Sequence, residues 1–284
     1  MAALSQSIAA SGPFRFLVGP EKKEYMMHAE LVARLSEPLR ALVTGGMDES
    51  CRGVVEWPEV DEATFMRFFQ FAYTGHFDAE APEPPPPKSP RLSEAAPEEL
   101  FEEAEPVIGA IYESFGNVHV LQRRNMRMAK QAWNTPEKSQ ANLWTLFREL
   151  YTPLEIRPTE WPLPEQDPTA DFTRVFLAYA RLYVLADEKD IQGLLDLSLR
   201  RLHHTLVHFN LQEKGADSIA SLAEYCFENT CDKGAKQDGL RRLVCLFSAC
   251  KLEILWTSEA FRRVFAETGD FSIGSVGMLL ARLD

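Results

Sequence analysis

The sequence predicts an α+β fold in which two separated stretches of chain complete one small domain. Residues 14–77 have the strand and helix patterns of half a compact domain, and residues 171–209 have two helical stripes that would close it. The run Pro84–Pro87 lies between them. Because a proline run neither continues a helix nor enters the interior of a sheet, we interpret the chain as one fold interrupted by a long insert.

Length and composition predict a chain with a sizeable hydrophobic core. With 284 residues, 45% of them hydrophobic, one or two domains are expected. We divide the chain into a disordered N-terminus at 1–13, a core domain at 14–77 and 171–209, a partly disordered acidic and proline-rich insert at 78–170, and a helical extension at 210–284.

Charge and cysteine content argue against several classes of partner. The net charge of −12 opposes attraction to nucleic acid or anionic lipid, so we expect neither as a direct partner. Five cysteines, an odd number, indicate a reducing compartment. No apolar run reaches the roughly 18 residues that span a bilayer. The segment before Arg15 contains no basic residue, so it lacks the charged start of a secretory signal. We expect an intracellular protein, cytoplasmic or nuclear.

Three short strands are expected in the first half of the core. Residues 14–18 have the period of a strand, with phenylalanine or valine at every second position. A turn at 19–24 leads to the apolar segment 25–27. The strand 14–18, this turn and the returning segment together predict a hairpin. The third strand is Val54–Trp57, which ends before a proline.

Helices are expected between and after these strands. Leucines at helical spacing cover 31–42, and Ser36 followed by Pro38 predicts that a second short helix begins there. The next helix is expected to start after Asp61 and to end at Gly75. Its apolar stripe consists of Phe65, Phe68, Phe69 and Ala72. Each buried phenylalanine contributes about 1.5–3 kcal/mol, so we expect this helix at the centre of the core.

The insert is acidic at its start and apolar near its end. From Asp78 to Phe115 ten residues are acidic and two are basic, and the part before Pro97 is expected to be disordered. The dense apolar pattern of 143–151 predicts a helix that docks on the main domain. The basic run 123–130 is interpreted as a solvated face or as a partner for the acidic stretch.

Helices dominate the rest of the chain. Apolar stripes predict helices at 172–186 and 191–206, with Asp190 as the N-cap of the second. The extension is expected to add helices at 218–227, 238–255, 258–268 and 272–282.

Taken together, these patterns resemble the BTB/POZ domain family, in the divergent form common in filamentous fungi. The similar stretches are 14–19, 27–39, 46–50, the helix 65–75 with its Tyr-Thr-Gly ending, and 180–187. The helical tail is also similar at 225–230 and 269–271. The similarity depends on the order and spacing of these stretches, not on one decisive motif.

The resemblance implies a non-enzymatic protein that binds other proteins through a sheet of about three strands packed against helices. Met47, Asp48 and Glu49 match the pattern by which some family members bind a cullin scaffold, which implies an alternative role as substrate adaptor of a cullin-type ubiquitin ligase. A nuclear transcriptional co-regulator that acts through the acidic segment is the other alternative. Pairing with a second copy stays open, because the N-terminal strand and helix that animal members exchange are not evident in 1–13.

No pattern in the sequence predicts catalysis, a cofactor or a metal site. The G-x-S-x-G, P-loop and G-x-G-x-x-G motifs are absent from the sequence. His204 and His208 are one helical turn apart and could hold zinc, but two ligands do not make a site. Cys226 and Cys231 lack the short spacing of zinc hooks. We interpret His28 as a structural imidazole that ties a strand to a helix.

Two features of the insert have alternative interpretations. The proline run is either a ligand for a polyproline-binding module or, as we favour, a stiff spacer. Ser89-Pro90-Arg91 is a candidate for proline-directed phosphorylation, which would add charge and keep the segment extended.

Overall fold

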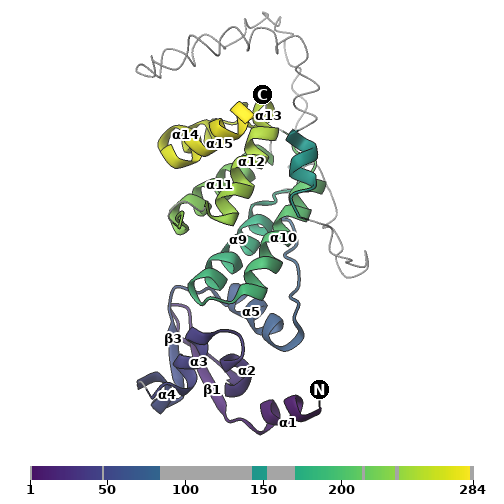
Figure 1. Ribbon diagram of the computed structural model, residues 1–284. Helices are drawn as coiled ribbons and strands as arrows, with labels where there is room; N and C mark the ends of the chain where they lie inside the picture. The colour runs from purple at the N-terminus through teal and green to yellow at the C-terminus, as the bar shows by residue number, and fades with distance from the viewer. Residues whose placement is uncertain are drawn as a thin grey trace, which may run out of the picture.

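The chain is α+β, mostly helical with one small mixed sheet. The structure is a computed structural model that describes residues 2–46, 48–83, 143–151, 170–212, 215–233 and 237–281. Its elements are stacked along one direction, from the sheet through two long helices to the C-terminal helices (Figure 1).

The sheet has three strands in the order β2-β1-β3. The central β1 (Pro13–Val18) pairs antiparallel with β2 (Lys23–His28) and parallel with β3 (Val54–Trp57). The three expected strands are therefore confirmed. The second begins at Lys23 rather than at 25, because its backbone continues to pair with Val18 although the side chain of Lys23 is exposed.

Four helices lie between the hairpin and Gly75 in the described part of the chain, and the capping residues expected from the sequence are found at the ends of two of them. They are α2 (Ala29–Ala33), α3 (Glu37–Thr44), α4 (Asp48–Arg52) and α5 (Glu62–Thr74). Ser36 caps α3 by accepting the Leu39 N–H (3.2 Å), and Asp61 caps α5 by accepting the Thr64 N–H (2.9 Å). Gly75 ends α5 with φ of 76°, the left-handed conformation that glycine adopts without strain.

The prediction of a disordered N-terminus is wrong for the residues described there. Helix α1 occupies Ala2–Ala10, a segment with four alanines and therefore high helix propensity. The residues after it are attached to α2: the Ser11 Oγ accepts from the Glu30 N–H (3.3 Å), and the Ala29 N–H donates to the Gly12 carbonyl (3.0 Å). Ile8 packs half-buried against the core.

The sheet half and the returning helices share one core. The long helices are α9 (Thr173–Glu188) and α10 (Gln192–His208). Phe77, which follows α5, is buried against Tyr179 of α9, and the Arg201 guanidinium of α10 lies 4.0 Å over its ring and donates to its carbonyl. Glu83 and Asp171, which are far apart in sequence, exchange two backbone hydrogen bonds (3.0 and 3.1 Å). The chain therefore leaves the core and returns to it at adjacent points.

The start of the insert is ordered where disorder was expected. Residues 78–83 run extended beside α5, and Arg67 of α5 pairs with Glu80. Gln70 donates to Asp78 (2.6 Å). These partners come from a helix that precedes the insert, which composition alone does not reveal.

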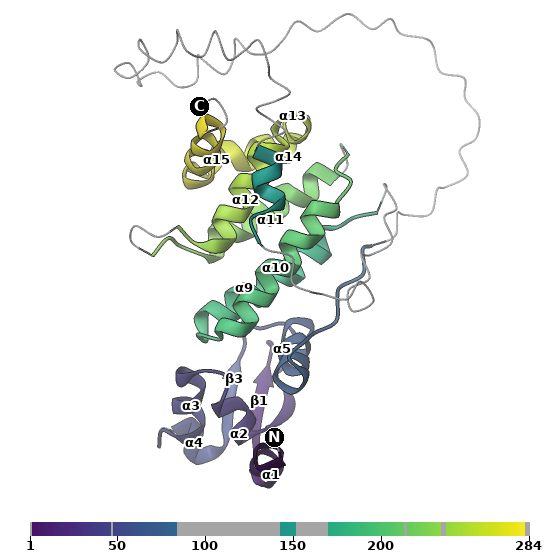
Figure 2. The same cartoon turned by 45° about the vertical axis from the view of Figure 1, so that its right-hand side comes forward.

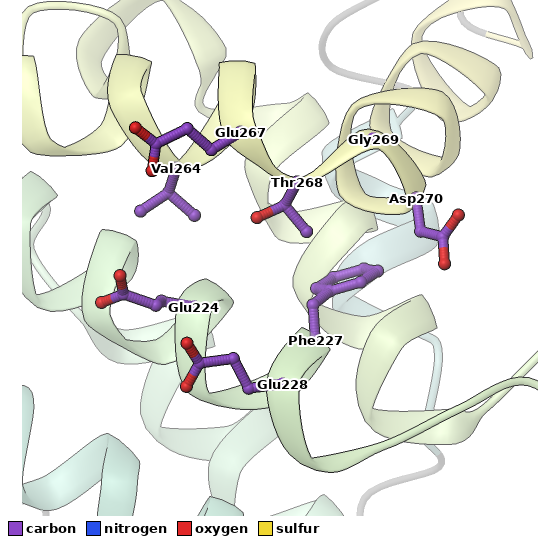
Figure 3. A pocket seen from close by; sticks show the side chains of 8 residues that line it. All are labelled: Glu224, Phe227, Glu228, Val264, Glu267, Thr268, Gly269 and Asp270. Atoms are coloured by element: carbon purple, nitrogen blue, oxygen red, sulfur yellow. The ribbon is translucent and has the colours of Figure 1, made fainter.

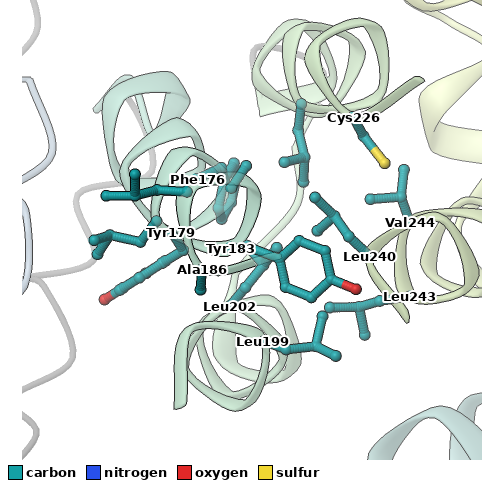
Figure 4. Packing of buried hydrophobic residues seen from close by; sticks show 14 of the residues in the cluster. Phe176, Tyr179, Tyr183, Ala186, Leu199, Leu202, Cys226, Leu240, Leu243 and Val244 are labelled. Carbon is teal, nitrogen blue, oxygen red and sulfur yellow. The ribbon is translucent and has the colours of Figure 1, made fainter. Parts of the chain in front are cut away.

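The C-terminal helices cover the other side of the α9–α10 pair (Figure 2). They are α11 (Gly215–Asn229), α12 (Gly239–Cys250), α13 (Leu252–Leu255), α14 (Glu259–Glu267) and α15 (Gly269–Ala281). Figure 4 shows side chains of α9 to α12 converging on one apolar centre, with the Tyr183 ring among the leucines of α10 and α12.

Two helix boundaries differ from the sequence prediction. The expected helix 238–255 is broken at Lys251, whose ammonium lies 4.1 Å over the ring of Trp144. Asp190 is not the N-cap of α10: it has φ of 53°, and its carboxylate accepts from the side-chain amide of Gln192 (2.7 Å). The contact of Lys251 with Trp144 is distant in sequence, whereas the contact of Asp190 with Gln192 is local.

Candidate interaction surfaces

The predicted partner-binding residues lie at the start of α4. Met47 is outside the residues that the structure describes. Asp48 is exposed and pairs with Arg52 one turn later (3.1 Å), whereas Glu49 is half-buried. Helix α4 buries none of its side chains completely, so Asp48 and Glu49 belong to an accessible surface. An exposed pair of this kind contributes little to folding, about 0.2–1 kcal/mol.

Local backbone conformation presents α4 beside α3. Gly46 has φ of 76°, which turns the chain sharply between the two helices. Helix α4 contacts α3 on one side and β3 on the other. Leu42 and Val43 of α3 remain partly exposed next to it. The resulting surface, formed by α3 and α4, combines apolar side chains with the carboxylates of Asp48 and Glu49.

His28 joins a strand to a helix, in keeping with the structural role expected from the sequence. Its Nδ1 is 2.8 Å from the Tyr73 hydroxyl, and its backbone N–H donates to the same oxygen (3.3 Å). Tyr73 begins the Tyr-Thr-Gly ending of α5. The contact fixes the end of β2 against the end of α5.

The 143–151 segment docks through its aromatic side chains. Phe147 is fully buried, with its ring 5.5 Å from that of Phe247 and 4.9 Å from the imidazole of His203. The His203 Nε2–H donates to the Phe147 carbonyl (2.6 Å). Burial of His203 lowers its pKa below the usual value, against the opposing effect of this hydrogen bond. Leu146, expected on the docked face, is exposed because the segment packs through Leu143 and Phe147 instead.

The remaining histidines and cysteines do not assemble a metal site in the part of the chain that is described. The His204 and His208 rings are 4.4 Å apart, and the His208 Nδ1–H donates to the His204 carbonyl (2.8 Å). Cys226 is buried and Cys231 is exposed. Among the described residues no group of three histidine, cysteine or acidic side chains could hold a metal ion. Burial raises the pKa of Cys226, and that of Cys245 to about 11, so both thiols stay protonated near neutral pH.

The structure forms an acidic pocket that the sequence analysis missed (Figure 3). It lies between the end of α11 and the junction of α14 and α15 and has a volume of about 430 Å³. Its lining residues are Glu224, Phe227, Glu228, Val264, Glu267, Thr268, Gly269 and Asp270. Glu224 and Glu228 come from α11 and Glu267 from α14, so the pocket favours a cationic group. The spacing of Glu224 and Glu228 was the only local signal, since Glu267 is far away in sequence.

A second pocket lies where the sheet half meets the C-terminal helices. It has a volume of about 340 Å³ and is lined by residues that precede or begin α5 and by residues of α9 and α11. Asp61 pairs with Arg181 of α9 (3.5 Å), which in turn lies 6.0 Å over the ring of Tyr225 of α11. Burial raises the pKa of Tyr225 to about 12. These contacts connect the N-terminal cap of α5 to the C-terminal extension.

Several sequence predictions lie outside the described residues. They are the proline run, the Ser89 phosphorylation candidate, the basic run 123–130 and most of the acidic stretch 78–115. The co-regulator hypothesis depends on that stretch and stays a prediction.

Comparison with known proteins assigns the chain to no family. No family model matches it, and neither the curated proteins nor the solved structures contain a match. Within the described residues, none of the helices is both long enough and apolar enough to cross a membrane.

Proposed function

We propose that the chain is a non-enzymatic protein–protein interaction protein built on a BTB/POZ-like core. The observation that carries the proposal is the joining of 14–77 to 171–208 around the insert. The hairpin, the parallel third strand and the helix that ends in Tyr73-Thr74-Gly75 occur in the order of that family. Helix α9 then packs beside α5 and α10 packs on α9, and the Glu83–Asp171 bridge brings the two ends of the interruption together.

The α3–α4 surface is the first candidate for the contact with a partner. It is accessible, and it combines partly exposed apolar side chains of α3 with the carboxylates of α4, a helix that buries none of its side chains completely. Specific interfaces bury about 800 Å² on each partner, more than a single pocket offers. A partner on this surface would therefore extend over α3, α4 and their neighbours.

A proximity-labelling experiment on the intact chain tests this function. A biotin-ligase fusion should label a small set of neighbours, and the strongest should bind the purified chain directly in biolayer interferometry. Paired substitutions Asp48→Ala and Glu49→Ala on the α3–α4 surface should weaken that binding, whereas Lys22→Ala on the hairpin turn should not. The proposal fails if no labelled neighbour binds the purified chain.

A cullin adaptor is the second candidate, favoured by the accessible position of Asp48 and Glu49 at the start of α4. The purified N-terminal domain of a cullin is the probe. Wild-type binding that is lost on Met47→Ala with Glu49→Ala, but kept on Arg52→Ala of the same helix, would support the adaptor role. A wild-type chain that does not bind any cullin removes this role and leaves the broader proposal to the labelling experiment.

A further inference from the structure

Helix α15 presents an apolar stripe to solvent. Ile273 is 74% exposed, Leu280 58% and Val276 40%. Their spacing of three and four residues places them on one face of the helix. Gly277 is exposed on the same face. In Figure 2 the helix lies at the outer side of the C-terminal layer.

The two glycines in the middle of α15 have different surroundings. A Cβ at Gly274 would lie 2.7 Å from the Cys245 sulfur, so packing against α12 requires glycine there. A Cβ at Gly277 would meet no atom within 4 Å, so nothing in the described chain requires it. Glycine destabilises a helix interior relative to alanine. A glycine that the chain itself does not need, on an exposed apolar face, indicates close approach by another backbone or side chain from outside.

We propose that this face is a homodimer interface in which two α15 helices pack antiparallel across a two-fold axis. The pattern is complementary to itself about a point between Val276 and Gly277. An antiparallel copy places Val276 over Gly277 of the partner subunit, a knob over a gap, and the two-fold axis repeats the contact. The same register places Ile273 opposite Leu280 of the partner subunit. A two-fold interface requires such self-complementarity.

Charge also favours a second copy as the occupant. The chain has a net charge of −12, so most of its surface repels a copy of itself. Between Asp270 and Arg282 the sequence has no ionisable residue, so this face can meet itself without repulsion. Antiparallel packing places the Asp270 ends of the two helices at opposite ends of the contact, so these carboxylates stay apart. It also aligns the two helix dipoles favourably.

The length of the apolar stripe on α15 determines how strong the proposed dimer can be. From Ile273 to Leu280 the helix rises only about 10 Å, so the buried area falls below the about 800 Å² per partner of a stable interface. The dimer should be weak and should form only as protein concentration rises.

Sedimentation velocity over a concentration series tests the interface with full-length protein. The wild type should move from monomer to dimer as concentration increases. Gly277→Leu fills the gap at a position where a Cβ meets no atom within 4 Å in the monomer. It should therefore keep the fold, checked by circular dichroism, and raise the dissociation constant at least about tenfold. Ile273→Ser should act similarly. Ile254→Ser, which removes an exposed apolar side chain of α13, is the matched control and should have no effect.

Cross-linking tests the register. In a background with Cys51→Ser and Cys231→Ser, a mixture of Ile273→Cys and Leu280→Cys proteins should form a disulfide between unlike chains faster than either forms one alone. A wild type that stays monomeric throughout the series would overturn the proposal. So would a dimer that Gly277→Leu and Ile273→Ser leave unchanged, or faster cross-linking between like chains.

Discussion

The sheet half and the C-terminal helices are held together by different kinds of contact. The sheet half is centred on aromatic rings: Phe16 lies 5.0 Å from Trp57 and 5.4 Å from Phe65 between ring centroids. Most of its ion pairs, such as Lys22–Glu56, are at the surface, and Arg67–Glu80 is the exception. In the C-terminal layer, polar groups are buried among the helices. Arg241 is the clearest example, because it donates to backbone carbonyls at the end of α11 and pairs with Asp270 of α15.

Geometry explains the difference. Strand pairing already fixes the register of β1 with its neighbours, since a shift by one residue would turn Phe16 towards solvent. Helices packed by apolar stripes can rotate at little cost, because apolar contact is not directional. Buried hydrogen bonds are directional and costly to leave unmade. We infer that the polar contacts of Arg241, Tyr183 and Asp238 fix which faces of α9, α11 and α12 meet.

The largest expected effect comes from removing an aromatic ring from the sheet half. Phe16→Ala leaves a cavity at a fully buried position and should lower the free energy of unfolding by about 3–5 kcal/mol. Phe176→Ala on α9 should have a similar effect, measured by urea unfolding. If the two stretches share one core, both variants shift the same transition. Two separate transitions, each sensitive to one variant, would show that the stretches fold independently.

The next effect tests the polar network of the helical layer. Arg241→Met keeps the apolar stem but leaves the Phe227 and Thr230 carbonyls without their buried donor, and should cost about 2–3 kcal/mol. Arg262→Met is the matched control. Arg262 also donates to a carbonyl, that of Trp256 (2.8 Å), but at the surface, so its loss should cost only about 0.5 kcal/mol. Equal costs for the two variants would contradict the comparison.

The docked 143–151 segment should make stability depend on pH. Burial lowers the pKa of His203 in the folded state, so folding favours the neutral imidazole. The contribution of neutral His203 to the free energy of unfolding is fully present above the pKa of about 6.5 that it has in the unfolded chain. This contribution is lost as the pH falls from there through the lower pKa of the folded state. Burial also lowers the pKa of His204. Urea unfolding should show lower stability at acid than at neutral pH, and His203→Gln should reduce that dependence without abolishing it.

Sequence predicted best where several local signals agree. Helix α5 has an N-cap at Asp61, an apolar stripe that includes Phe65 and Phe68, and a left-handed Gly75 at its end, and all three appear in the structure. The first strand was similarly clear, since its period of two continues up to a turn.

Sequence failed where distant residues decide. Helix α1 was missed although its four alanines favour a helix, because the contact of its end with α2 does not appear in a local pattern. The break at Lys251 was missed because no glycine or proline marks it. The acidic pocket depends on α14 folding back beside α11, and Glu224 and Glu267 show no relation in sequence. No helix was predicted around the partner residues 47–49, but from Asp48 onward they lie in the short helix α4.

The smallest expected effects come from one glycine in each region, and they should have opposite signs. Gly75→Ala should destabilise the chain by about 1 kcal/mol, because φ of 76° strains a residue with a Cβ although the surrounding space is open. Gly277→Ala, also in open space but inside a helix, should stabilise the monomer by up to about 1 kcal/mol. Thermal unfolding at low protein concentration measures both. A loss of stability for Gly277→Ala would mean that the monomer itself needs this glycine, which would remove the reason to assign it to contact with a second chain.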